Sequence, residues 1–299
     1  MEYKNRLTDF APALTEAEVA AEVARIKELS ARNCRKEVYA FALSAVDLTT
    51  LTCNDSVESV SAFAKRAVDF YVKYPDLANV ASICVYPSFV ETVGLAVDGS
   101  PMRITSVAAG FPASQTFLEV KMLEVAMAIE NGADEVDIVL ALNSFLAGNH
   151  EAAAEEIRQV RKSIDEVAER QGRKVHLKVI LETGLLRTPE RIAQASFLAM
   201  EAGADFIKTS TGKVDVNATP AAAYVMCECI AKYHAVTGKK IGFKPAGGIS
   251  SAADALCYYS IVASILGKEW LNKELFRFGV SRVANSILSA VEQKTVSYY

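Results

Sequence analysis

Histidine is scarce in this sequence, and its three copies are not arranged as metal ligands. His150, His176 and His234 are the only histidines among 299 residues, and they form neither an HxH nor an HExxH pattern. Zinc and related metals are usually held by closely spaced histidines or cysteines. We therefore expect no metal and no other cofactor, which opposes a metal-dependent enzyme.

Basic runs and long apolar stretches are also missing. The chain has 32 Lys and Arg against 36 Asp and Glu, and it shows no basic segment of the kind that binds nucleic acid. No apolar stretch approaches the roughly 18–20 residues of a membrane span. Residues 1–33 are acidic, which is the wrong charge for a signal or transit peptide. We expect a soluble, cytoplasmic protein with no nucleic-acid or membrane partner.

The six cysteines show no spacing typical of a disulfide framework, and a chain of this length needs no disulfides to fold stably. Cys227 and Cys229 form a CxC pair, but residues two apart on a helix point in different directions. We expect both to be ordinary packed thiols.

Eight short apolar runs recur along the chain at regular spacing. They are residues 46–48, 83–86, 104–107, 136–140, 177–181, 206–209, 241–244 and 276–279. Runs that are apolar on both faces are typical of buried parallel strands. The segments between them have helical spacing, and Thr188-Pro189 and Thr219-Pro220 each place an N-cap residue before a first-turn proline.

Eight strand–helix units over about 250 residues predict an α/β fold, a closed (β/α)8 TIM barrel. An open doubly wound sheet is the alternative, but it would need a glycine-rich phosphate loop, and neither GxGxxG nor GxxxxGK[ST] occurs. We expect residues 41–299 to form the barrel catalytic domain with a C-terminal tail. Residues 1–40 are expected to form an N-terminal helical extension, which would cover the barrel bottom or contact another subunit.

A weak internal repeat relates two of the expected strands. Gly-Ala-Asp-Glu-Val-Asp at 132–137 aligns with Gly-Ala-Asp-Phe-Ile-Lys at 203–208. Asp137 and Lys208 then hold equivalent positions in strands 4 and 6. Strands of the same parity fill the same interior layers of such a barrel, so the repeat predicts that this carboxylate and this amine lie at one height inside it.

Ionisable residues interrupt several of the buried runs. Asp137, Lys178, Lys208 and Lys244 lie in expected strands, and Glu182 lies higher on strand 5. Buried charges are costly unless they are paired or used in chemistry. A purely structural network of ion pairs is one interpretation, but three lysines against one aspartate are poorly balanced for it.

Lys208 and Lys244 lie on consecutive strands, about 4.8 Å apart by sheet geometry. Two ammonium groups roughly 6 Å apart repel by about 2.8 kcal/mol at an effective dielectric constant near 20. That repulsion would lower the pKa of one lysine by about 2 units. Schiff-base chemistry needs a neutral amine, so we expect Lys208 to bond covalently to a carbonyl substrate. Asp137 would move protons through a water molecule.

Three loops at the carboxyl ends of the strands carry glycines and positive charge. Residues 209–213 follow strand 6 and begin with Thr209, while 245–250 and 279–282 follow strands 7 and 8. Glycines let backbone N–H groups approach an anion, and the loops after strands 7 and 8 are the usual phosphate site of a barrel. Lys213 and Arg282 add charge. We expect a phosphorylated small-molecule substrate, although simple turns would account for any single glycine.

The motifs around these lysines resemble those of a known family, the deoxyribose-phosphate aldolases, which are class I aldolases. The likeness runs from about residue 45 to about residue 288. Its most specific parts are Phe-Ile-Lys-Thr-Ser-Thr-Gly-Lys at 206–213 and Gly-Phe-Lys-Pro-Ala-Gly-Gly at 242–248. Residues 47–51, 133–137 and 178–184 support it in the same order along the chain.

The resemblance implies a reaction and a role for each matched residue. Members of this family reversibly cleave 2-deoxy-D-ribose 5-phosphate to D-glyceraldehyde 3-phosphate and acetaldehyde without a metal. By motif position, Lys208 resembles the Schiff-base lysine, Lys244 the neighbour that lowers its pKa, and Asp137 the aspartate that relays protons. Asp47 resembles the aspartate placed to hydrogen-bond sugar hydroxyls. The phosphate-loop positions are matched by Gly212, Lys213, Gly247, Gly248 and Ser281.

The sequence departs from the family pattern in two places. The last loop has Ser281-Arg282 where many members have two serines, so the pose of Arg282 on a phosphate is its own. Residues 138–143 differ from the commoner phenylalanine-proline version, which bears on acceptor preference. The chain ends in Tyr298-Tyr299; some members finish in a tyrosine that reaches the active site, and a frayed terminus is the alternative.

Other functions stay open at this point. A different Schiff-base aldolase or a transaldolase would use the same amine and differ in its carbonyl donor. A metabolite-binding or scaffolding protein is opposed by the complete set of Lys208, Lys244 and Asp137. Cys84, near the end of strand 2, is expected to be a core residue rather than a pocket residue. As a partner we expect further copies of this chain, in a dimer or tetramer.

Overall fold

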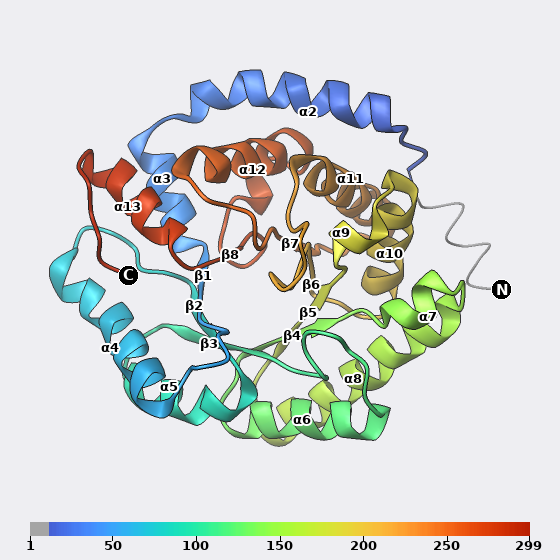
Figure 1. The fold of residues 1–299 in the computed structure, drawn as a ribbon, viewed down its shortest axis with the longest axis horizontal. Coiled ribbons are helices and arrows are strands. Elements are labelled where there is room, and N and C mark those ends of the chain that lie inside the picture. The colour runs from blue at the N-terminus through green and yellow to red at the C-terminus, as the bar shows by residue number, and fades with distance from the viewer. Residues whose placement is uncertain (1–11) are drawn as a thin grey trace.

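The computed structural model describes residues 12–299, in which eight parallel strands form a barrel surrounded by helices (Figure 1). Each strand pairs with its neighbour in sequence, and β1 also pairs with β8. Isolated bridges join Phe243 to Phe276 and Ala246 to Gly279, which closes the ring between β7 and β8. The strands are β1 Val46–Thr49, β2 Ser82–Val85, β3 Arg103–Val107, β4 Glu135–Val139, β5 His176–Ile180, β6 Phe206–Lys208, β7 Gly242–Lys244 and β8 Phe278–Val280. The predicted (β/α)8 barrel is confirmed.

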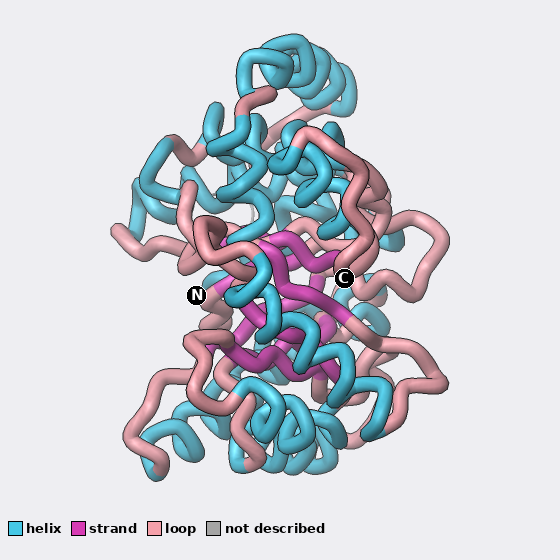
Figure 2. Tube along the Cα trace, turned by 90° about the vertical axis from the view of Figure 1, so that its left-hand side faces the viewer, coloured by secondary structure: helices cyan, strands magenta, loops and turns pink. Residues whose placement is uncertain are grey.

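Helices cover the outside of the barrel, and Figure 2 shows the strands enclosed between helical layers. The helices that follow β1 to β8 in turn are α4 Val57–Lys73, α5 Val90–Val97, α6 Leu118–Glu130, α8 His150–Arg170, α10 Pro189–Glu201, α11 Pro220–Thr237, α12 Ala252–Ile265 and α13 Val283–Glu292. Thr188 and Thr219 cap α10 and α11 through their hydroxyl groups, as the sequence predicted. Two short helices, α7 Leu142–Leu146 and α9 Thr183–Leu186, precede α8 and α10.

Two more helices precede β1. They are α2 Glu16–Ser30 and α3 Lys36–Ser44. The apolar face of α2, made by Val19, Val23 and Ile26, is buried. That face packs on α11 and α12, along the outer side of the helix ring (Figure 1). The expectation that this segment covers the barrel bottom is therefore wrong for α2.

The composition of α11 explains where α2 lies. One side of α11 packs on the barrel, yet apolar residues occur around most of the helix, so its outer side also needs a cover. Cys227 and Cys229 point in different directions and are both buried, as free thiols. α2 provides that second cover.

The C-terminal tail docks on the outside of the barrel. The ring of Tyr299 stacks on Phe70 of α4 with centroids 5.6 Å apart, and its hydroxyl donates to Asn79 Oδ1 at 3.0 Å. The hydroxyl of Tyr298 donates to the backbone of Arg66 in α4. The tail is therefore neither frayed nor placed in the barrel interior in this structure.

Candidate active site

The strand register arranges the inward-pointing side chains in layers of four, as in other barrels of this type. Because the strands are tilted, a level that runs around the barrel moves up by one residue at each strand. Only every second strand points a side chain into a given layer, so each layer has four residues. The lowest layer consists of Ser82, Glu135, Phe206 and Arg277. The middle layer consists of Asp47, Thr105, Lys178 and Lys244. The upper layer, towards the carboxyl ends of the strands, consists of Cys84, Asp137, Lys208 and Gly279.

Asp137 and Lys208 therefore share the upper layer, as the internal repeat predicted. Lys208 Nζ donates to Asp137 Oδ2 at 2.8 Å. The same oxygen accepts from Lys244 Nζ at 2.7 Å, and Oδ1 accepts from Lys178 Nζ at 3.0 Å. One fully buried carboxylate thus binds three lysine amines, two of them through a single oxygen atom.

The charges inside the barrel balance more closely than the sequence suggested. The expected count of three lysines against one aspartate omitted Glu135, Asp47 and Arg277, which are all completely buried. Arg277 donates to Glu135 Oε1 at 2.7 Å and to Asp47 Oδ1 at 2.5 Å. The three layers then hold three carboxylates and four basic groups. Charge neutrality is reached when one of the four basic groups is uncharged.

Lys208 is the basic group whose environment favours the neutral form. Burial lowers the pKa of Lys208, Asp137 opposes the change, and the charge of Lys244 adds to the lowering. Burial is thus a larger cause than the repulsion between the two lysines from which the lowered pKa was predicted. The pKa of Lys208 is lowered, as expected, but burial is its main cause.

Lys244 shows the opposite behaviour although it lies in the next strand at the paired position. Burial alone would lower the pKa of Lys244, but the carboxylates of Asp137 and Asp47 outweigh burial and raise it. Lys244 Nζ lies 2.5 Å from Asp47 Oδ2 and 2.7 Å from Asp137 Oδ2. Two carboxylates therefore hold Lys244 as an ammonium ion.

The two aspartates are held ionised by their basic neighbours. Burial by itself raises the pKa of Asp137, but Lys178, Lys208 and Lys244 outweigh it and bring the pKa far below its usual range. Burial likewise raises the pKa of Asp47, and the charges of Lys244 and Arg277 lower it to about 2. Asp137 is thus a strong hydrogen-bond acceptor and, while its three partners are charged, a weak base.

A cavity of about 810 Å³ opens above the upper layer. Lys208 lines it, together with loops that follow β1, β6, β7 and β8. Seven of the predicted site residues line this cavity. They are Lys208, Gly212, Lys213, Gly247, Gly248, Ser281 and Arg282. The structure thus brings together the amine and the loop residues that the sequence singled out.

Thr209 and Asp47 do not line the cavity, and their expected contact with substrate stays a prediction. Thr209 is completely buried, and its hydroxyl binds the backbone N–H and C=O of Ala246, which ties the end of β6 to β7. Asp47 lies one layer lower, and Lys244 separates it from Asp137. Cys84 is completely buried in the upper layer and also lies outside the cavity lining, in agreement with the expected core position.

Two glycines in this region are required by their surroundings. Gly247 has φ +69°, and a Cβ there would lie 2.9 Å from the side chain of Asn217. A Cβ on Gly279 would lie 2.7 Å from Ala246 Cβ and 3.0 Å from Lys244 Cε. The missing side chain at Gly279 thus leaves the space in the upper layer through which the chain of Lys244 extends.

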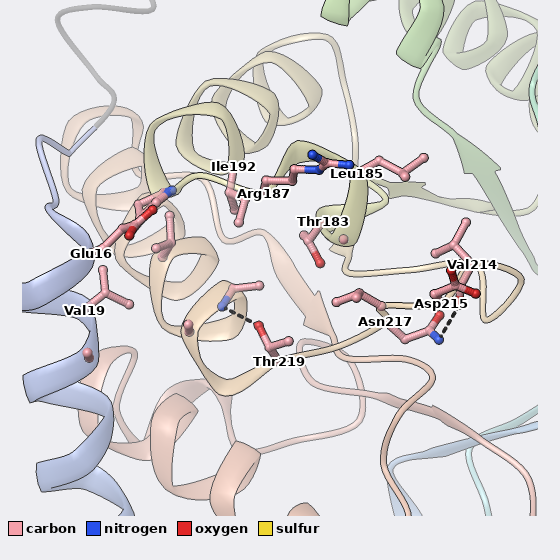
Figure 3. Close-up of a pocket in the computed structure, with 17 residues that line it drawn as sticks. Glu16, Val19, Thr183, Leu185, Arg187, Ile192, Val214, Asp215, Asn217 and Thr219 are labelled. Carbon is pink, nitrogen blue, oxygen red and sulfur yellow. Dashed lines mark hydrogen bonds between the residues drawn. The ribbon is translucent and has the colours of Figure 1, made fainter.

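A second cavity of about 850 Å³ lies outside the barrel, between α2, α9, α10 and α11 (Figure 3). Its wall is mainly apolar and includes Val19, Ile192 and Val216, with Glu16 and Arg187 among the polar residues. None of the predicted site residues or of the charged residues inside the barrel lines it. The cavity above Lys208 is therefore the candidate active site, although it is slightly smaller.

Within residues 12–299, no group of three or more His, Cys, Asp or Glu is placed to hold a metal ion. No helix of that range is both long enough and apolar enough to cross a bilayer.

A lysine of lowered pKa at the carboxyl end of a barrel, beside a carboxylate and a fixed ammonium ion, is the arrangement expected of an enzyme that uses an amine nucleophile. Residues 41–258 match the family described as DeoC/LacD family aldolase. This chain belongs to that family.

Individual relatives agree with this assignment. The chain is 42% identical over 294 residues to the human protein named deoxyribose-phosphate aldolase, which covers 92% of this chain and 87% of the relative. It is 40% identical over 277 residues to a putative deoxyribose-phosphate aldolase of Caenorhabditis elegans, covering 92% and 88%.

Solved structures show the same fold. A putative deoxyribose-phosphate aldolase from Toxoplasma gondii ME49 superposes with a TM-score of 0.73 at 23% identity, covering 86% of this chain and 95% of that one. The deoxyribose phosphate aldolase of Aeropyrum pernix, described as having a unique tetrameric structure, superposes with a TM-score of 0.67 at 23% identity, covering 89% and 97%.

We predict that Arg277→Met lowers the free energy of unfolding at pH 7 by about 3–5 kcal/mol, because Asp47 and Glu135 stay buried without a basic partner that binds both. The measurement is urea unfolding. The lowered pKa of Asp47 stabilises the fold above its unfolded value of 3.8, and this contribution is lost as the pH falls through the folded value of about 2. The difference between wild type and variant should therefore shrink between those two values.

Arg158→Met is the matched control. Arg158 also binds two glutamates, Glu151 and Glu155, but on the outer surface of α8. Its loss should cost less than about 1 kcal/mol. An equally small loss for Arg277→Met would contradict the view that it compensates buried carboxylates.

Proposed function

We propose that this chain catalyses the reversible cleavage of 2-deoxy-D-ribose 5-phosphate to D-glyceraldehyde 3-phosphate and acetaldehyde, through a Schiff base on Lys208. The observation that carries the proposal is the setting of Lys208, a buried amine of lowered pKa that borders the cavity and touches Asp137. The substrate is inferred from relatives about 40% identical that are named deoxyribose-phosphate aldolase.

The first steps use Lys208 as the nucleophile. Its neutral amine adds to the aldehyde carbon of the open-chain sugar, and loss of water from the carbinolamine gives a protonated imine. The imine draws electrons from the bond between carbons 2 and 3 as the hydroxyl on carbon 3 loses its proton. That bond breaks, which releases D-glyceraldehyde 3-phosphate and leaves an enamine on Lys208. Protonation of the enamine and addition of water then release acetaldehyde.

Asp137 and Lys244 support these steps from below. Asp137 accepts hydrogen bonds from both amines through Oδ2, so it fixes Lys208 in place and can orient a water molecule for proton transfer. Lys244 remains charged between Asp47 and Asp137. Its charge disfavours an ammonium ion on Lys208 before the substrate binds.

The phosphate group of the substrate is proposed to bind the rim formed by the loops after β6, β7 and β8. Gly212, Gly247 and Gly248 have positive φ values, which lets their backbone face the cavity without a side chain. Lys213 and Arg282 line the same cavity and supply positive charge. Ser281 adds a hydroxyl group there.

A different Schiff-base aldolase or a transaldolase is the second candidate, because it would use Lys208 in the same way. The two candidates differ in the donor that forms the enamine. Synthesis assays with acetaldehyde and with ketone donors, each offered with D-glyceraldehyde 3-phosphate, distinguish them. Turnover of acetaldehyde is expected, and exclusive turnover of a ketone would favour the second candidate.

We predict that sodium borohydride with 2-deoxy-D-ribose 5-phosphate inactivates the protein irreversibly, because hydride reduces the imine to a stable secondary amine. Peptide mass spectrometry should map the adduct to Lys208, and Lys208→Ala should form none. An adduct mapped to Lys244, or no adduct on the wild-type chain, would overturn the assignment of the nucleophile.

Lys244→Met is expected to move the rise of activity with pH to higher pH. Removing the ammonium ion leaves Asp137 Oδ2 to Lys208 alone, which favours the charged form of Lys208 and raises its pKa. Since burial is the larger cause of the lowered pKa, the shift should be smaller than about 2 units. The measurement is kcat/KM against pH; an unmoved profile would leave burial as the sole cause.

Assembly of several copies of this chain is also proposed, as a dimer or tetramer. The support is a stripe of exposed apolar side chains at the start of α6 and along it, Phe117, Val120, Leu123 and Met127, whose spacing places them on one face. Light scattering should give a mass of at least twice the 32.3 kDa of one chain. A mass of one chain at micromolar concentration would contradict the proposal.

Three expectations from the sequence stay predictions. They are the cytoplasmic location, the independence of metal and of other cofactors, and the division into residues 1–40 and 41–299. Activity that survives treatment with a chelator would support the second of them.

A further inference from the structure

Glu182, at the end of β5, combines backbone strain with a buried carboxylate. Its φ and ψ values of 54° and 59° lie in the left-handed region, which is unfavourable for a residue with a side chain. Only 2% of the residue is exposed. Strain of this kind persists when surrounding contacts over-determine it and is concentrated at functional sites, which prompts the question of what Glu182 holds.

The carboxylate of Glu182 binds Thr211, in the loop after β6. Thr211 donates its hydroxyl to Glu182 Oε2 at 2.5 Å and its backbone N–H to Oε1 at 3.2 Å. The hydroxyl oxygen of Thr211 also accepts from the backbone N–H of Lys213 at 3.0 Å. The N–H groups on both sides of Gly212 are therefore engaged within the protein.

Gly212 lies between these two engaged residues and borders the cavity above Lys208. Gly212 has a φ of +81°, a left-handed conformation that suits glycine and changes the direction of the chain at this residue. Within residues 12–299, no acceptor binds the N–H of Gly212. Of the three loop residues that line the cavity, Thr211, Gly212 and Lys213, only Gly212 thus has a free backbone donor, and the contact between Glu182 and Thr211 holds the residue before it.

The rest of the loop is fixed by close packing. Figure 3 shows Val214, Asp215 and Asn217 opposite Thr183 of α9. A Cβ on Gly184 of α9 would lie only 2.0 Å from the carbonyl oxygen of Val216, so α9 and the loop are in tight contact. Packing on α9 thus anchors the loop near Val216, and the link between Glu182 and Thr211 holds its other end beside Gly212.

A negative charge close to a phosphate site would by itself weaken the binding of phosphate. Burial raises the pKa of Glu182, and the hydrogen bonds from Thr211 oppose that change. The carboxylate of Glu182 is therefore explained better by its hydrogen bonds to Thr211 than by its negative charge.

We propose that Glu182 is a positioning residue that, through Thr211, directs the N–H of Gly212 at the phosphate group and so gives preference for a phosphorylated over an unphosphorylated sugar. This inference rests on the proposed function, since it concerns the phosphate end of the same site. Glu182 acts on that end. Because the charge of Lys208 is among the causes that lower the pKa of Glu182, a variant that keeps both charges is part of the test.

The kinetic test compares 2-deoxy-D-ribose 5-phosphate with 2-deoxy-D-ribose in the wild-type chain, Glu182→Ala and Thr211→Val. For both variants we expect KM for the phosphorylated sugar to rise about tenfold or more with little change in kcat. The kcat/KM for the unphosphorylated sugar should change less than about threefold. Thr211→Val keeps the charge of Glu182, so the same effect in both variants separates positioning from charge.

Glu190→Gln is the control variant. Glu190 is an exposed glutamate at the start of α10, and its substitution should leave both substrates unaffected. Equal losses on the two sugars in Glu182→Ala, or no loss on either, would overturn the inference.

A second measurement does not depend on the reaction. Hydrogen exchange of backbone amides, followed by NMR, is compared with and without inorganic phosphate. Phosphate should slow the exchange of the Gly212 amide in the wild-type chain and have no such effect in Glu182→Ala. If the wild-type chain cleaves neither sugar, the proposed function fails and this measurement still decides the role of Glu182. An unchanged Gly212 amide in the wild-type chain, or equal protection in Glu182→Ala, would refute it.

Discussion

The site depends on charge balance among side chains buried inside the barrel. Three carboxylates and four basic groups fill three layers of the barrel, and almost all of them are completely buried. Such an interior is neutral only when one basic group gives up its proton, and uncompensated charge is costly at this depth. The basic group at the mouth of the barrel is Lys208. The reactivity of this amine is therefore a property of the whole interior and not of one neighbour.

Two lysines that look alike in the sequence differ in protonation state because they lie at different heights inside the barrel. Lys244 lies between Asp47 and Asp137 and remains charged. Lys208 contacts one of these carboxylates and borders the cavity. The difference amounts to one step in height inside the barrel. A Schiff-base lysine needs both the low pKa and the access that this step provides.

The sequence predicted the strands and the barrel from the regular spacing of its apolar runs. It predicted the pairing of Asp137 with Lys208 from a short internal repeat. The interior partners Glu135 and Arg277 were missed, since their contacts depend on how strands are staggered around the closed ring. Arg277 did carry a signal, as an arginine inside an expected buried strand. Thr209 faces away from the barrel interior because side chains alternate along a strand, so the residue after an inward lysine lies on the other side. Asp47 points inward one layer below Lys208, and only the register reveals its depth.

The position of Arg277 has a consequence for how the chain matures. Asp47 and Glu135 belong to β1 and β4, which leave the ribosome long before Arg277, one of the two basic residues that contact both of them. A nascent barrel without β8 has an open seam and two inward carboxylates with reduced compensation. Water can enter that seam and solvate them, which favours a loose, hydrated intermediate over a closed one. The last strand thus both closes the ring and supplies a basic partner for Asp47 and Glu135, so a chain that ends before β8 leaves the barrel interior open to water.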